Sequence, residues 1–95
     1  MKVDLRKALR RALRTGDVYV GSKRTIKALK EGKAKMIIVA KNCPEEVLEE
    51  IEKYEVKRVK YNGTNMELGA ICGKPFSVAA LAIVNEGESE ILNAE

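Results

Sequence analysis

The sequence predicts an α/β fold in which one central sheet carries helices on both faces, a three-layer αβα sandwich. Predicted helices and strands alternate along the 95 residues, and this alternation favours a single sheet between two helix layers. The stretch Lys35–Ala40 contains the continuous apolar run Met-Ile-Ile-Val, which is typical of a central strand covered on both faces. The length suffices for one domain and not for two, so we expect a single domain over residues 1–95.

Two helices are predicted in the first third of the chain. Asp4–Thr15 repeats apolar residues at the i, i+3, i+4 and i+7 spacing of one buried stripe, with Asp4 as N-cap and Gly16 just past its end. The second helix, Lys23–Glu31, follows Ser22 as its cap.

Two further helices are predicted after the central strand. Pro44 fits the first position of the third helix, because its missing N–H would be unpaired there anyway, and the apolar side of this helix extends to Tyr54. Thr64 and Glu67 have the spacing of a capping box, which opens a fourth helix that continues through Cys72.

Four strands are predicted between these helices, and the third of them has the alternating character of a strand near the sheet edge. The strands are Val18–Val20, Lys35–Ala40, Val56–Tyr61 and Val78–Val84. A polar turn follows the last strand, and residues 91–95 add one more short segment or fray.

Charge is distributed very unevenly along the chain. Residues 1–41 carry thirteen Lys or Arg and three Asp or Glu, a net charge of +10, whereas residues 42–95 carry five and eleven, a net charge of −6. Such asymmetry indicates one face suited to a polyanion and another that is acidic and solvated. For a basic chain of this size, nucleic acid is the favoured partner.

The composition argues against catalysis and against a resident metal or cofactor. The chain has no His, so it lacks the usual acid/base group near neutral pH and the commonest metal ligand. Gly21-Ser22-Lys23 lacks the spacing of a phosphate-binding P-loop, and no Ser has a His partner. We therefore expect no enzyme, no catalytic residue, no cofactor and no small-molecule substrate.

The two cysteines and the apolar segments are consistent with that view. Cys43 and Cys72 lie far apart without a CxxC pattern, so we expect two reduced, half-buried thiols and no metal site. The apolar run Val78–Val84 is too short to cross a bilayer, and residues 1–6 do not resemble a signal peptide. A cytoplasmic protein is expected, and the excess of Lys and Glu without Gln hints at a hot environment.

Three strand-to-helix or loop junctions are candidate sites, because such junctions of an open α/β sheet tend to lie at one end of the sheet. The first, Gly21–Arg24, offers backbone N–H groups at a helix N-terminus together with Lys23, Arg24 and Lys27. Basic residues are locally unfavourable at that end of a helix, and a locally poor choice often marks function.

The other two junctions are Lys41-Asn42 and Gly73–Val78. Asn42 is either a cap for the third helix or a reader of a base edge, and its spacing favours the cap. Phe76, the only Phe, is either a plug over the core or a platform for an unpaired base.

Four segments of the chain are informative when they are taken together: GSKRTIK (21–27), GKAKMIIVAKN (32–42), GTNMELG (63–69) and GKPF (73–76). As a set they closely resemble the L thirty e family of large-subunit ribosomal proteins of archaea and eukaryotes. The resemblance covers nearly the whole chain and is specific as a set. It implies an αβα sandwich with a four-stranded mixed sheet, and an RNA partner that is a kink-turn or a related bent internal loop.

The resemblance also implies site residues, all of which lie at the three junctions. Gly21, Ser22, Lys23 and Arg24 would meet the backbone and groove of the bent RNA, and Lys27 would add a phosphate contact. Asn42 becomes a candidate base reader. The RNA-binding set is completed by Lys74 and by Phe76, Ser77 and Val78, which would pack against the extruded nucleotide.

The expected function is therefore to bind and hold a bent element of ribosomal RNA in the large subunit, next to other ribosomal proteins, as a monomer when free. One alternative is an RNA-binding protein of a guide-RNA particle. Such relatives carry Asn-Glu where this chain has Lys23-Arg24, which favours the ribosomal branch. The other alternative is a protein-interaction adaptor that uses the acidic third helix.

Overall fold

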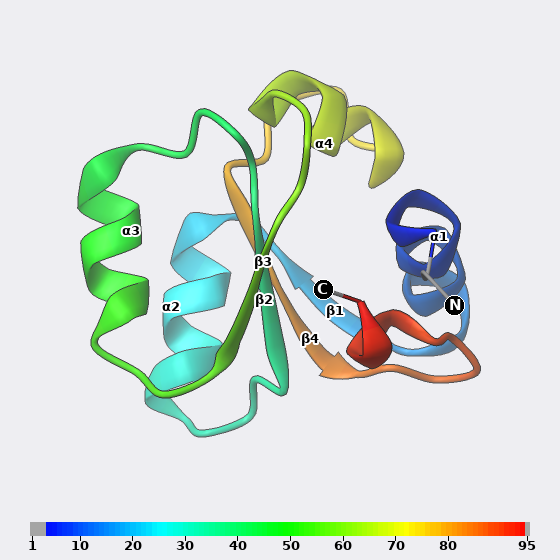
Figure 1. Ribbon diagram of the computed structural model, residues 1–95, viewed down its shortest axis with the longest axis horizontal. Helices are drawn as coiled ribbons and strands as arrows, with labels where there is room; N and C mark the ends of the chain where they lie inside the picture. Colours follow the sequence, from blue (N-terminus) through cyan, green and yellow to red (C-terminus); the bar gives the residue numbers. More distant parts are fainter. Residues whose placement is uncertain (1–3, 95) are drawn as a thin grey trace.

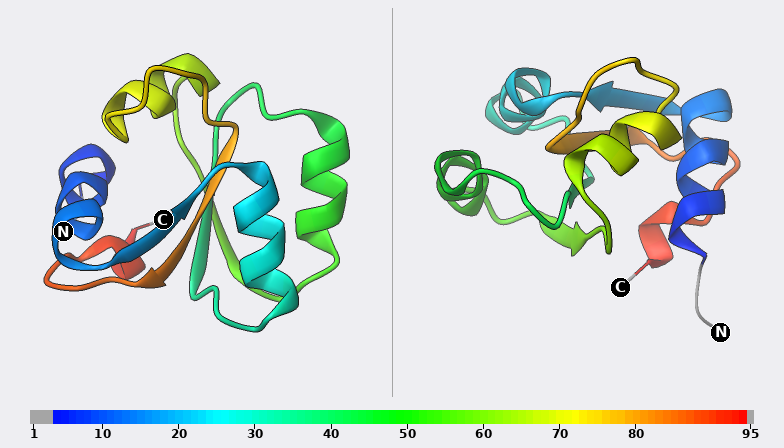
Figure 2. Two further views of the ribbon diagram at one scale, coloured as in Figure 1. Left: turned by 180° about the vertical axis from the view of Figure 1, so that it is seen from behind. Right: turned by 90° about the horizontal axis from the view of Figure 1, so that it is seen from above.

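A four-stranded sheet separates two layers of helices in the structure, a computed structural model that describes residues 4–94 (Figure 1). The helices are α1 (Leu5–Thr15), α2 (Ser22–Lys30), α3 (Glu45–Glu52), α4 (Asn65–Ile71) and the 3-10 helix η1 (Ile91–Asn93). The strands are β1 (Asp17–Val20), β2 (Met36–Val39), β3 (Lys57–Lys60) and β4 (Ala80–Asn85). Helices α1, α4 and η1 cover one face and α2 and α3 the other, so the predicted α/β sandwich is confirmed (Figures 1 and 2).

The sheet is mixed, with the strand order β1-β4-β2-β3. Strand β4 pairs antiparallel with both β1 and β2, whereas β2 and β3 are parallel. Strand β3 therefore lies at an edge, as its alternating sequence predicts. The two central strands, β2 and β4, have the most apolar sequences, because a strand flanked on both sides and covered on both faces has almost no contact with water.

Successive residues of the central strands point into two separate hydrophobic cores. Met36 and Ile38 of β2 pack with α1 and α4, while Ile37 and Val39 pack with α2 and α3. Strand β4 shows the same alternation, with Leu81 and Ile83 in the first core and alanines in the second. The small alanines at 80 and 82 bring the backbone of β4 close to α2.

Two of the predicted helix caps are confirmed. The side chain of Asp4 accepts a hydrogen bond from the N–H of Lys7, and α1 starts directly after it. Thr64 accepts from the N–H of Glu67 at 3.3 Å, which is the Thr half of the predicted capping box. Each bond satisfies one backbone donor that a helix start leaves without a partner.

Two other predicted helix starts are wrong by one residue. Ser22 is the first residue of α2 and not its cap, since Gly21 occupies the N-cap position with φ of 106°. Pro44 is the N-cap of α3 and not its first residue, because its ψ of 141° is extended rather than helical. Helix α3 also ends at Glu52, before Tyr54.

The last predicted strand starts two residues late in the structure. Val78 donates its N–H to the carbonyl of Asn65 at the start of α4, so it belongs to the loop, and β4 begins at Ala80. The predicted final segment is the short helix η1, whose Ile91 is fully buried in the first core. The predictions that concern residues 1–3 and 95 lie outside the described residues.

No helix in the described range 4–94 has the length and apolarity needed to cross a membrane.

Replacing a central side chain tests whether the first core holds the fold. Leu81 is fully buried where β4 faces α1 and α4. We expect Leu81→Ala to lower the free energy of unfolding by about 2–5 kcal/mol, since it removes buried methyl groups and leaves a cavity. Chemical denaturation measures the loss, and Met66→Ala is the control because Met66 is 73% exposed. Equal stability of the two variants would contradict this packing.

Candidate nucleic-acid interface

The ends of three strands and the start of the fourth meet at one end of the sheet, at the top of Figure 1. The register shows this directly, because Val39, the last residue of β2, pairs with Ala80 at the start of β4 and with Lys60 at the end of β3. Val20, at the end of β1, pairs with Leu81. The three junctions singled out in the sequence therefore lie side by side, as expected for an open α/β sheet.

Backbone hydrogen bonds join these junctions to one another. Gly21 donates to Ala80 at 3.0 Å, which ties the start of α2 to β4. The amide of Ala40 donates to the carbonyl of Ala79 at 2.8 Å, and that of Val78 donates to Asn65 at 2.8 Å. The interface is thus built on paired backbone rather than on free loops.

The start of α2 presents open backbone donors next to positive charge. Gly21 has φ of 106°, a conformation that side chains rarely allow, and its carbonyl accepts from both the N–H and the hydroxyl of Thr25. No described side chain caps the first N–H groups of this helix. Lys23 and Arg24 are exposed beside them, so this end of α2 is suited to an anionic oxygen.

Arg24 is held by an aromatic ring of the preceding strand. Its guanidinium carbon lies 4.7 Å from the centre of the Tyr19 ring. A guanidinium that stacks on a ring keeps its N–H donors free in the plane while losing rotational freedom. Lys27 is exposed one turn further along α2, so it lies at the margin of the interface rather than at its centre.

Asn42 caps a different helix from the one expected. The sequence favours a cap on α3, but the side-chain oxygen of Asn42 accepts from the N–H of Asn65, the first residue of α4, at 2.7 Å. The Asn42 amide nitrogen also donates to the Asn65 side chain at 3.3 Å. The cap on α3 is therefore wrong. Asn42 is exposed and fixed in orientation between β2 and α4.

The loop before β4 is pressed against α4. A side chain at Gly69 would begin 2.1 Å from the carbonyl oxygen of Phe76, so only glycine permits this contact. Lys74, Phe76 and Ser77 are exposed on the outer side of the loop, and Phe76 is 58% exposed although it is the only Phe. The side chain of Val78 is buried in the first core, so it positions the loop and offers no surface.

Two residues of this end of the sheet are absent from the sequence-based set. Asn65 is the partner of Asn42, and Met66 beside it is the most exposed large apolar side chain among residues 4–94. Met66 lies inside the capping box, between Thr64 and Glu67, and does not share the buried stripe of Leu68 and Ile71. An apolar residue off the stripe of its helix is the signal that marks it.

The cysteines take no part in this interface. Both are free and half-buried, as predicted. Burial raises the pKa of each thiol above its ordinary value, and Lys74 offsets this only in part at Cys72. Protonated thiols are poor nucleophiles and poor metal ligands. No group of three or more potential metal-ligating residues gathers anywhere between residues 4 and 94.

The sequence of this chain is similar to those of known ribosomal proteins over nearly its whole length. Residues 3–93 match the model of the ribosomal protein L7Ae/L30e/S12e/Gadd45 family. A large ribosomal subunit protein eL30 of Archaeoglobus fulgidus is 63% identical over 82% of this chain and 91% of its own length. The proteins of that name from Methanosarcina mazei and Methanopyrus kandleri are 45% and 46% identical, over 99% and 94% of this chain and 91% and 85% of their own lengths.

The family match spans almost the whole described structure and includes every segment that meets at this end of the sheet. These matches confirm the resemblance inferred from the four sequence segments. The chain belongs to the ribosomal protein L7Ae/L30e/S12e/Gadd45 family.

Proposed function

We propose that this chain binds a kink-turn or a related bent internal loop of ribosomal RNA and holds its kink in the large ribosomal subunit. A structural role in the cytoplasmic ribosome follows from its family and from relatives named as large-subunit proteins. That family also favours a protein that is not an enzyme. The finer statement, that the ligand is bent RNA, is supported by the chemistry of the three joined junctions.

The observation that carries the proposal is the combination of donors and apolar platforms on one rigid end of the sheet. The start of α2 supplies backbone N–H groups, Lys23 and Arg24 for phosphates. The exposed Phe76 and Met66 supply apolar surface on which an unpaired base can stack. A regular duplex offers phosphates but no free base, so an RNA with both features fits this surface best.

Asn42 adds an amide between these two regions. One of its N–H groups and its oxygen already contact Asn65, so its second N–H is available to an acceptor on a base edge. Because Asn65 fixes the amide orientation, contact with a base requires little further ordering of this side chain. We infer that Asn42 contributes selectivity and that Lys23, Arg24, Lys27 and Lys74 contribute charge.

The two alternatives rest on weaker observations. A guide-RNA particle would use the same surface, but the named relatives are ribosomal and Lys23-Arg24 departs from the guide-protein pattern. An adaptor would use α3, whose glutamates are mostly exposed. Exposed charge without apolar surface is an ordinary solvated helix face, so α3 alone does not support a protein partner.

Shape selectivity is the first property to measure. We expect the chain to bind a kink-turn RNA at least about tenfold more tightly than a straight duplex of equal length. This preference should persist when salt is raised from about 50 to about 200 mM, because only the phosphate contacts weaken steeply with salt. Fluorescence anisotropy titrations give both affinities. Equal affinity for the two RNAs, lost together at high salt, would reduce the interaction to charge attraction and overturn the proposal.

A single lysine tests the phosphate contact at α2. We expect Lys23→Ala to weaken kink-turn binding about five- to tenfold and to lower the slope of log affinity against log salt by about 1, because one phosphate contact is lost. Lys53→Ala is the control, since Lys53 pairs with Glu50 at the far end of α3. A salt slope unchanged from that of the parent chain would remove Lys23 from the interface.

Phe76 tests the stacking contact. We expect Phe76→Ala to weaken kink-turn binding by about 1–3 kcal/mol, the range for loss of one stacked base, and Phe76→Tyr to retain most of the affinity because a tyrosine ring also stacks. Both variants should fold, since the side chain is largely exposed. If Phe76→Ala binds the kink-turn as tightly as the parent chain, the ring contacts no base and the stacking contact is overturned.

A further inference from the structure

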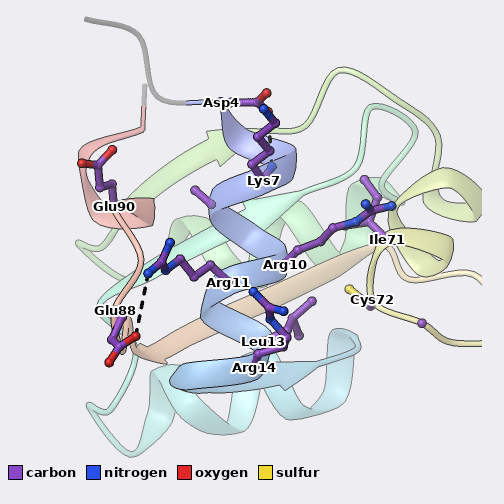
Figure 3. A pocket seen from close by; sticks show the side chains of 12 residues that line it. Asp4, Lys7, Arg10, Arg11, Leu13, Arg14, Ile71, Cys72, Glu88 and Glu90 are labelled. Carbon is purple, nitrogen blue, oxygen red and sulfur yellow. Dashed lines mark hydrogen bonds and ion pairs between the residues drawn. The ribbon is translucent and has the colours of Figure 1, made fainter.

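A groove lined by cationic side chains lies between α1 and the end of α4, on the face of the sheet opposite α2 and α3 (Figure 3). Its volume is about 990 Å³. One wall is formed by Lys7, Arg10, Arg11 and Arg14 of α1, and the other includes residues 71–73, where α4 ends. None of these four cations belongs to the candidate interface described above.

The four cations form a single row on α1. Their positions follow the i, i+3, i+4 and i+7 spacing of one helix face, and all four are exposed. The row from Lys7 to Arg14 spans about 10 Å along the axis at 1.5 Å per residue, close to the screening length of physiological salt. Helix α1 holds no acidic residue, so neighbouring like charges in this row destabilise the helix that carries them.

Arginine is concentrated in this helix. Four of the six Arg of the chain lie in Leu5–Thr15, while Lys accounts for most of the positive charge elsewhere. A helix face that only contacts water does not require arginine, because lysine keeps such a face solvated equally well. The guanidinium group presents a planar set of N–H donors that matches two phosphate oxygens at once, so its use here indicates a phosphate ligand.

Most of this charge is available to a ligand. Arg11 turns toward Glu88, with 3.8 Å between their charged atoms, whereas Arg10 reaches toward the end of α4 (Figure 3). Within residues 4–94, Lys7, Arg10 and Arg14 form no ion pair. Three carboxylates also line the groove, those of Asp4, Glu88 and Glu90, and the Asp4 carboxylate caps α1. Four cations against three carboxylates leave the lining with a net charge of +1, and the positive charge is concentrated along α1.

The groove continues directly into the candidate interface. Gly73 lines it, and the next residues are Lys74 and the loop that exposes Phe76. Its apolar lining consists of Ala8, Leu13, Ile71 and Cys72, which are buried or half-buried. The two large apolar side chains exposed in the described chain, Met66 and Phe76, do not line it, so the groove lacks the exposed apolar anchor on which a protein partner depends. A ligand strand that passes the loop and extends along the first face of the sheet meets the four cations.

We propose that this groove binds the phosphate backbone of an RNA stem that extends from the bent element, as a second contact of the same RNA. The inference rests on the proposed function for the position of that RNA, but not for the chemistry of the groove. The contact is to phosphates only, so it adds affinity and fixes the direction of the stem without reading its sequence.

The test compares two RNAs and two matched double variants. One RNA is a minimal kink-turn, and the other is the same kink-turn with each stem lengthened by about one helical turn. Arg10→Gln with Arg14→Gln removes two groove charges, and Lys30→Gln with Arg58→Gln removes two exposed charges from α2 and β3, away from the groove. Gln is a good helix former, so circular dichroism should show both variants folded.

We expect the groove variant and the control variant to bind the minimal kink-turn with affinities within about twofold of each other. We expect the groove variant to bind the extended RNA about tenfold more weakly than the control variant does. The slope of log affinity against log salt for the extended RNA should be lower by about 2 in the groove variant. The same affinity for the extended RNA in both variants would overturn the inference, because the row would then be a solvated face.

A straight duplex as long as the extended kink-turn, titrated in the same way as a third RNA, separates this inference from the proposed function. Suppose that the parent chain binds the bent and the straight extended RNAs equally, yet the groove variant binds both more weakly than the control variant does. The groove would then be a phosphate site, and the proposed kink-turn selectivity would be wrong. If the parent chain prefers the bent RNA but the two variants bind the extended RNA with the same affinity, the kink-turn proposal is supported and the groove inference is wrong.

Discussion

The antiparallel pairing of β4 with β2 is the interaction on which the rest of this structure depends. It brings Ala80 beside Val39, and so fixes the loop before β4 against the junction after β2. It also sets which residues of each strand enter which core. A shift by one residue would exchange the two faces and move every apolar side chain into the wrong core, so burial on both sides specifies the register strongly.

The fold could be predicted largely from the sequence because its signals are local. The buried stripe of α1, the apolar run of β2 and the Thr half of the capping box at Thr64 each depend on residues a few positions apart, and all three are present in the structure. The errors fall at ends of elements. Ser22 and Pro44 are each misplaced by one residue, since a backbone angle and not a residue type decides where a helix begins.

The candidate site is harder to predict from the sequence than the fold, because it is made by contacts between segments that are distant along the chain. The sequence does predict that the three junctions are neighbours, because strand-to-helix junctions of an open α/β sheet generally lie at one end of the sheet. The hydrogen-bond partner of Asn42 could not be predicted, because Asn65 lies 23 residues away in the sequence and no local spacing links the two. The burial of Val78 likewise depends on its bond to Asn65, which no local pattern encodes.

The backbone hydrogen bonds among the junctions have a consequence for how the cost of ordering is divided between protein and ligand. The segments that carry Gly21, Asn42 and Phe76 are fixed to β4 or α4 before any ligand arrives. The protein therefore loses little backbone freedom on binding, and the loss falls on the ligand. A ligand that samples the bent form only rarely binds with an apparent affinity reduced by that fraction. If the ligand is the proposed bent RNA, ions that already bend it would act in concert with the protein without contacting it.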